Sequence, residues 1–198
     1  MGLSSKSRFP WSGAKRGYAE TIGNAFGYLY PDEIAALKLL AANLSSDSPR
    51  AVNIGAGPGT SGLALLEGNE NLHLWTIDIA KKGRPEGALK NELTAFKKGR
   101  IDKSRYDQIH GDSIEVGKNW RHGKVDLVFV DGCHFYEHAL GDIETWLPHV
   151  KNGGIMAIHD FSPEPWGAVM DAVHNSSLMN YKCILIQHTT IAFSVGEF

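Results

Sequence analysis

Short apolar runs alternate along the chain with segments whose apolar residues recur every three or four positions, and this alternation predicts an α/β fold. The run 125–130 is apolar at every position except Asp126, which is typical of a strand buried in a parallel sheet. The predicted strands are 50–54, 72–79, 106–110, 125–130, 155–158, 183–187 and 191–195. The predicted helices are 31–44, 60–67, 88–98, 135–150 and 166–174.

The order of these elements predicts how the sheet is connected. Strands that alternate with helices favour a mostly parallel sheet. The last two strands are joined by a short link, 188–190, which predicts an antiparallel hairpin. We therefore expect a Rossmann-like, mostly parallel sheet with helices on both faces and a C-terminal antiparallel hairpin. A chain of 198 residues favours one domain, with a cofactor-binding core at 50–195. Residues 1–30 are interpreted as an N-terminal arm that could fold over a site as a lid.

Composition narrows the class of partner. The contents of hydrophobic residues, 42%, and charged residues, 21%, are typical of a globular protein. A net charge of -2 does not favour binding to nucleic acid or to an acidic membrane surface. No apolar run is long enough to cross a bilayer. Two cysteines do not suggest a disulfide framework, so a reducing compartment, the cytoplasm, is expected. A small molecule is the expected partner, and self-association into a homo-oligomer stays open.

Three alternating glycines, Gly55, Gly57 and Gly59, lie between a predicted strand and a predicted helix. A strand that enters a helix through a glycine turn is the usual ligand-binding corner of an open α/β sheet, because a missing side chain lets a ligand approach the backbone. The stretch from Gly57 to Gly62 also matches G-x-G-x-x-G, the dinucleotide fingerprint. An NAD-dependent oxidoreductase is therefore an alternative.

Four acids follow predicted strands, namely Asp78, Asp112, Asp131 and Asp160. The carboxyl ends of parallel strands meet at one edge of a sheet, which is where such folds bind ligands. A carboxylate at Asp78 can accept both hydroxyls of a ribose, and Asp112 could close the far side of the same pocket. The alternative for each is a loop acid that caps the next helix.

Two histidines accompany the last two acids. His134 follows Asp131, and His159 precedes Asp160. Two carboxylates with an imidazole could hold a divalent cation, Mg²⁺ or Mn²⁺. His134 could instead act as a general base, because the pKa of an imidazole lies near neutrality. The alternative is that both histidines bond loop carbonyls.

Residues 50–195 resemble a class I S-adenosylmethionine-dependent methyltransferase. Asn53 to Gly59 resembles the family's first motif, with Asn53 in place of its usual acid. Asp78 matches the ribose-binding acid, and 111–113 matches the segment beside the adenine. The resemblance implies a cofactor-binding set of Asn53, Gly55, Gly57, Gly59, Asp78, Asp112 and Asp131.

Residues 125–136, with 152–154 and 159–160, further resemble small methyltransferases related to the macrolide-sugar O-methyltransferases and to the cephalosporin-hydroxylase-like group. They are more distantly similar to catechol O-methyltransferase. That resemblance implies that Asp131 and Asp160 bind the cation, with His159 compensating for Phe161, which replaces an asparagine ligand. His134 stands where the catechol enzyme has its base.

The predicted function is methylation of a hydroxyl oxygen of a small molecule by S-adenosylmethionine. In this prediction His134 and Asp131 are catalytic, and Asp131, His159 and Asp160 hold a cation. The NAD-dependent oxidoreductase and a non-catalytic nucleoside-binding protein of the same fold are the alternatives.

Overall fold

The computed structural model describes residues 17–26, 28–79, 87–165 and 167–196, and these form one seven-stranded sheet in the order β3-β2-β1-β4-β5-β7-β6. Strands β1 to β5 pair in parallel, whereas β7 is antiparallel to both β5 and β6. The strands are β1 Arg50–Ile54, β2 His73–Asp78, β3 Tyr106–His110, β4 Val125–Val130, β5 Val150–Ile158, β6 Lys182–Gln187 and β7 Thr190–Val195. The predicted fold class is confirmed, including the closing hairpin.

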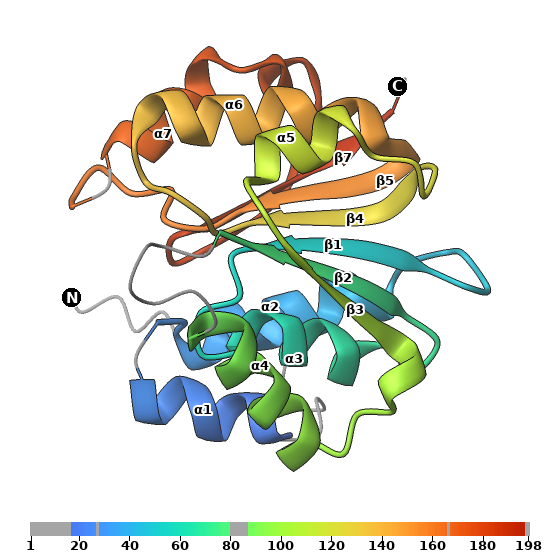
Figure 1. Ribbon diagram of the computed structural model, residues 1–198. Coiled ribbons are helices and arrows are strands. Elements are labelled where there is room, and N and C mark those ends of the chain that lie inside the picture. Colours follow the sequence, from blue (N-terminus) through green and yellow to red (C-terminus); the bar gives the residue numbers. More distant parts are fainter. Residues whose placement is uncertain (1–16, 27, 80–86, 166, 197–198) are drawn as a thin grey trace, which may run out of the picture.

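Helices cover both faces of this sheet, as Figure 1 shows. One face carries α1 to α4 and the other carries α5 to α7, with α1 farthest from the sheet. The helices are α1 Tyr18–Phe26, α2 Pro31–Ala42, α3 Thr60–Gly68, α4 Gly87–Lys98, α5 Ser113–Lys118, α6 Tyr136–Trp146 and α7 Gly167–Asn175. None of the helices in the described ranges combines the length and the hydropathy needed to cross a bilayer.

Strand β4 lies at the centre of the sheet, and its position explains its apolar run. Leu127 and Phe129 belong to the core on the α1–α4 side, whereas Val128 and Val130 belong to the core on the α5–α7 side. All four are at most 4% exposed. Because successive side chains of a strand point to opposite faces, a strand between two helical layers needs apolar residues at nearly every position.

The predicted boundary between α6 and β5 is wrong. The helix expected at 135–150 ends at Trp146, and a 3₁₀ turn, Leu147–His149, follows it. Pro148 explains the end, since proline lacks the N–H for an α-helical hydrogen bond and disfavours helical geometry in the residue before it. Strand β5 then begins at Val150 rather than at Ile155, with a shift of register against β4.

The segment before α2 was predicted only as part of an N-terminal arm, and the structure forms α1 there. Ala19 and Ile22 are buried in the core of the α1–α4 side. Lys38 of α2 bonds both Glu20 of α1, at 2.6 Å, and Glu67 of α3, at 2.8 Å. Helix α1 is thus packed on two other helices, and residues 1–16 and 27 of the predicted arm lie outside the described residues.

Candidate active site at the carboxyl edge of the sheet

Backbone hydrogen bonds step across the carboxyl ends of four neighbouring strands. The N–H of Gly55 donates to Ile77 at 2.8 Å, that of Asp131 donates to Ile54 at 2.9 Å, and that of His159 donates to Val130 at 2.9 Å. These bonds join the ends of β2, β1, β4 and β5 in turn. The N–H of Gly111 donates to Asp78 at 3.0 Å and adds β3. The predicted meeting of the acidic segments at one edge therefore exists.

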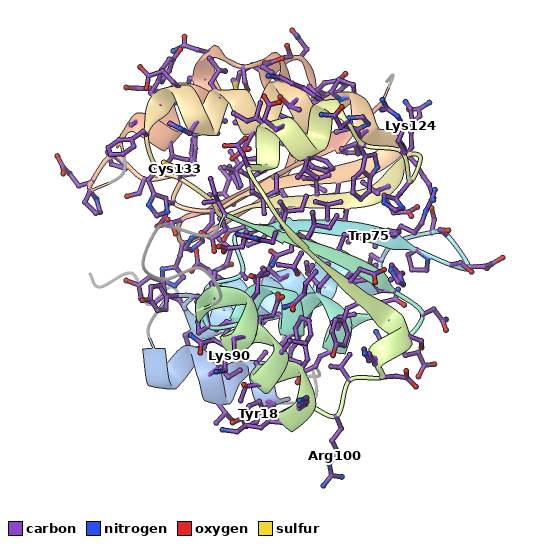
Figure 2. The ribbon with its side chains drawn as sticks, viewed as in Figure 1. Tyr18, Trp75, Lys90, Arg100, Lys124 and Cys133 are labelled. Atoms are coloured by element: carbon purple, nitrogen blue, oxygen red, sulfur yellow. The ribbon has the colours of Figure 1, made fainter. Side chains whose placement is uncertain are left out.

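Figure 2 labels a residue near each end of β4. Cys133, which follows the strand, lies at the edge that carries the acids, and Lys124, which precedes it, lies at the opposite edge. Cys133 is a free, exposed thiol. The candidate site therefore lies at the end of β4 that Cys133 follows, and the end near Lys124 lies away from it.

The three glycines of the turn serve different purposes. All three have positive φ, +92° at Gly55, +48° at Gly57 and +92° at Gly59, a conformation that residues with a side chain rarely adopt. A Cβ at Gly55 would lie 2.0 Å from the carbonyl oxygen of Asp131, and one at Gly59 would lie 2.8 Å from the Cα of Glu92. A Cβ at Gly57 would meet nothing within 4 Å among the described residues. Gly57 is thus the glycine at which the turn borders open space.

Asp78 and Asn53 both stabilise this turn. Asp78 Oδ2 accepts the N–H of Ala56 at 2.8 Å, so its carboxylate faces the turn from the end of β2. Asn53 is fully buried, and its Nδ2 donates to the carbonyl oxygen of Gly55 at 3.0 Å. Asn53 thus contacts the turn from beneath, whereas Asp78 lies beside it and is partly exposed.

Asp112 caps a helix that sequence reasoning did not place. Its Oδ1 accepts the N–H groups of Ile114 and Glu115 at 3.0 and 3.1 Å, at the start of α5. The cap was the alternative interpretation of this acid, and the structure realises it. The spacing of Asp112 and Glu115 is that of a capping box, a signal that could have predicted α5.

Two carboxylates and two imidazoles meet where β4 and β5 end. His134 Nε2 lies 2.8 Å from Asp160 Oδ2. His159 Nδ1 lies 3.1 Å from Asp131 Oδ1 and 3.3 Å from Asp160 Oδ2. One potential ligand atom from each of Asp131, His134 and Asp160 lies within 4.8 Å of the others, a spacing that suits a divalent cation. The structure therefore brings together all four residues predicted for metal binding and base catalysis.

The two imidazoles differ in access to solvent. His159 is 7% exposed, whereas the side chain of His134 is 33% exposed. The hydrogen bond with Asp160 raises the pKa of His134. Burial lowers the pKa of His159, but the charges and hydrogen bonds of Asp131, Asp160 and Glu33 outweigh it and raise that pKa. Burial acts to raise the pKa of Asp160, but its hydrogen bonds with both histidines outweigh burial and hold that pKa well below its usual range.

Glu33 is a member of this cluster that sequence reasoning missed. It is fully buried at the start of α2, and its Oε2 lies 3.4 Å from His159 Nε2. Burial raises the pKa of Glu33, but the hydrogen bonds from His159 and from the backbone of Tyr30 outweigh it and lower that pKa. The sequence around Glu33 is typical only of a helix start, so no local signal points to the site.

A second missed acid, Glu92 of α4, lies beneath the glycine turn. It is fully buried and accepts the hydroxyl of Thr76 at 2.8 Å and the amide of Gln108 at 2.6 Å. A Cβ at Gly62 would lie 2.6 Å from Glu92 Oε1. The third glycine of the formal dinucleotide match therefore serves the packing of α3 on α4. Burial raises the pKa of Glu92 to about 8 despite these hydrogen bonds.

Comparison with known proteins decides the family. Residues 52–161, more than half of the chain, match a family described as a methyltransferase domain. The chain belongs to this methyltransferase family. Its matched stretch runs from β1 through the glycine turn to the residue after Asp160, so it contains every residue predicted for the site. The predicted class of enzyme is confirmed, and the NAD-dependent oxidoreductase is set aside.

Three similar proteins place the methyltransferase among known sequences and structures. It is 26% identical over 164 residues to an uncharacterized protein of Acanthamoeba polyphaga mimivirus, covering 76% of this chain and 69% of the viral protein. It is 27% identical over 116 residues to mycinamicin VI 2''-O-methyltransferase of Micromonospora griseorubida, covering 50% of this chain but only 29% of that enzyme. A Podospora anserina methyltransferase solved with SAH bound shares the fold, at a TM-score of 0.68 and 19% identity, covering 91% of this chain and 88% of that one.

Proposed function

We propose that this methyltransferase transfers the methyl group of S-adenosylmethionine to a hydroxyl oxygen of a small molecule, with a divalent cation in the site. The observation that carries the proposal is the meeting of an open glycine turn with a carboxylate–imidazole cluster at one edge of the sheet. The sulfonium already activates the methyl group, so the protein's tasks are to align the reactants and to remove the acceptor proton.

The turn and its acids are proposed to hold the cofactor. Gly57 lets the ligand lie against the backbone, because no side chain fills that space. Asp78 accepts the ribose hydroxyls while its bond to Ala56 fixes the turn. Asn53 acts indirectly, by holding Gly55 from beneath. Gly55 and Gly59 allow the turn to pack closely, and Asp112 with α5 closes the pocket beside the adenine.

The carboxylate pair fits a divalent cation. Asp131 and Asp160 supply oxygens, which Mg²⁺ and Mn²⁺ prefer, and His159 presents Nδ1 to both carboxylates from the buried side. A cation bound there would lower the pKa of the acceptor hydroxyl and fix its oxygen. The residues present therefore suit the ion that the resemblance implies.

His134 is proposed as the general base. It is the more exposed of the two imidazoles, so an acceptor arriving from solvent can reach it. Its hydrogen bond to Asp160 orients the ring, in the way that a carboxylate orients the catalytic histidine of other enzymes. Asp131 joins the chemistry by positioning His159 and the cation rather than by taking the proton itself.

Binding and transfer measurements test this proposal. Calorimetric titration should give saturable binding of SAH and none of NADH. Transfer of labelled methyl from S-adenosylmethionine to a panel of hydroxylated small molecules should then proceed with Mg²⁺ and fall on addition of EDTA. Binding of SAH with no transfer to any acceptor would favour the non-catalytic nucleoside-binding alternative. An undiminished rate of transfer in EDTA would show that the cation is not needed, and the proposal of methyl transfer would stand without it.

A further inference from the structure

The neighbours of His159 show that its Nε2 carries a proton. Its Nε2 faces Glu33 Oε2 at 3.4 Å and Thr189 Oγ1 at 3.3 Å. The hydroxyl proton of Thr189 is donated to Glu33 Oε1 at 2.9 Å, so the Thr189 oxygen can only accept from His159. Two acceptors facing one ring nitrogen require that this nitrogen carries a proton, and the same reasoning puts a proton on Nδ1, which faces two carboxylates.

Nδ1 is directed at Asp131 and Asp160. A cation bound by these acids would displace the proton of Nδ1, because a ligating imidazole is neutral, and the proton that remains would be the one on Nε2, facing Glu33. Histidines that bind metals commonly donate their other N–H to a carboxylate, which fixes both the ring orientation and the tautomer. Glu33, His159 and the acid pair are arranged in this way. We propose that Glu33 is a positioning residue that holds His159 with Nδ1 towards Asp131 and Asp160, an inference that rests on the cation site of the proposed function.

Glu33 is itself held firmly. Its Oε1 accepts the N–H of Thr189 at 3.0 Å and the hydroxyl of Thr190 at 3.0 Å, and its Oε2 accepts the N–H of Tyr30 at 3.0 Å. A fully buried carboxylate with this many donors has one orientation, so the imidazole that it bonds has one as well.

The support comes from outside the family-matched stretch. Glu33 precedes residues 52–161, and Thr189 and Thr190 follow them. The start of α2 and the turn between β6 and β7 converge on His159 from opposite ends of the chain. The family's matched stretch supplies the acids and His159, and flanking segments of this chain supply the residue that orients His159.

The Glu33→Gln variant tests this inference against Asp32→Asn as the matched control. Asp32 lies beside Glu33 and bonds the same turn, through Gln187 at 2.8 Å and His188 at 2.7 Å, but its side chain is 45% exposed. Electron paramagnetic resonance of free Mn²⁺ measures the affinity of each variant for the ion. Loss of a residue that orients a metal ligand should weaken Mn²⁺ binding by about 10- to 100-fold in Glu33→Gln, whereas Asp32→Asn should stay within about twofold. SAH affinity, measured by calorimetry, should be unchanged in both.

The outcomes separate the inference from the function on which it rests. Folded Glu33→Gln protein that binds Mn²⁺ as tightly as the unmodified protein would overturn the inference. If that variant does not fold, ¹⁵N resonances of the imidazole in the unmodified protein decide: an Nε2 that keeps its proton when Mg²⁺ is added supports the inference, and an Nε2 that loses it overturns the inference. If the unmodified protein binds no Mn²⁺, both the cation site and the inference are wrong. SAH binding and methyl transfer in EDTA would still test the transferase function separately.

Discussion

The two ends of β4 each carry a carboxylate, and the contrast between them shows what distinguishes a structural acid from a candidate catalytic one. Asp126, near the start of the strand, accepts the N–H of Arg50 at 2.8 Å and the ammonium of Lys151 at 2.7 and 2.8 Å. Asp131, just after its end, meets the imidazole of His159. A hollow of about 240 Å³ lies beside Asp126 and Lys151.

The difference lies in the partners rather than in burial or available space. Asp126 is bonded by an ammonium and a backbone N–H, which are donors only and can neither bind a metal ion nor accept a proton. Imidazoles can bind a metal ion or take a proton, so the Asp131 end can do chemistry. A buried acid beside a hollow is therefore insufficient to mark a site.

The largest effect is expected from Asp160→Asn. The variant keeps the shape of the side chain, and asparagine tolerates the φ of +58° at this position. It removes the charge that both His134 and His159 contact, so turnover should fall by about a thousandfold, within the range typical of a lost acid–base group. SAH affinity should be retained, because Asp78 and the turn are untouched. Steady-state rates and calorimetry check the two halves of this prediction, and equal losses in both would contradict it.

Glu92, which packs against the glycine turn, should make the free energy of unfolding depend on pH. Because burial raises its folded pKa from 4.5 to about 8, its contribution is fully present below about pH 4.5 and is lost as the pH rises towards 8. At 1.36 kcal/mol per pKa unit, the free energy of unfolding should fall by about 3 kcal/mol between pH 5 and pH 8 from this group. Urea unfolding of the unmodified protein and of Glu92→Gln checks this, and identical slopes for the two would count against it.

Asp78→Asn should weaken cofactor binding without affecting the cation. Hydrogen bonds to a charged group contribute about 1.5–3 kcal/mol, so SAH affinity should fall by about 30-fold. The variant can still accept the N–H of Ala56, so the turn should keep its shape. Calorimetric titration with SAH measures the first effect and Mn²⁺ titration is the control. An SAH affinity equal to that of the unmodified protein would remove Asp78 from the cofactor site.

Lys151→Ala, at the structural end of β4, should alter stability alone. Asp126 would lose its ammonium partner but would keep the N–H of Arg50. Since Lys151 is partly exposed, the loss should be about 1 kcal/mol of unfolding free energy. Urea denaturation measures that loss. SAH and Mn²⁺ affinities should match those of the unmodified protein. A change in either would contradict the claim that the Asp126 end of β4 has a structural role alone.

The strands and the meeting of the acids could be predicted because their signals are local. The apolar run around Leu127 and Phe129 indicates a strand buried on both faces, and the acids that follow the strands indicate the carboxyl edge of the sheet. Asp112 also carried a local signal, the capping-box spacing, but it marks a helix start as well as a ligand site.

What could not be predicted depends on contacts between distant parts of the chain. Glu33 and His159 are 126 residues apart, and nothing near Glu33 distinguishes it from any acid in a first helical turn. The different roles of the glycines at 55, 57 and 59 likewise appear only when Asp131 and Glu92 pack against the turn. The helix α1 was missed because Gly23 lowers its helical propensity, and its stability comes from packing on α2 and α3.

A crystal structure of the protein grown with SAH and Mn²⁺ is the most direct test of the account, because anomalous scattering locates the metal independently of the refined coordinates. We expect a manganese peak between Asp131 and Asp160 within bonding distance of His159 Nδ1, and SAH ribose hydroxyls on Asp78. A manganese peak remote from these acids, or SAH bound away from Gly57, would contradict it.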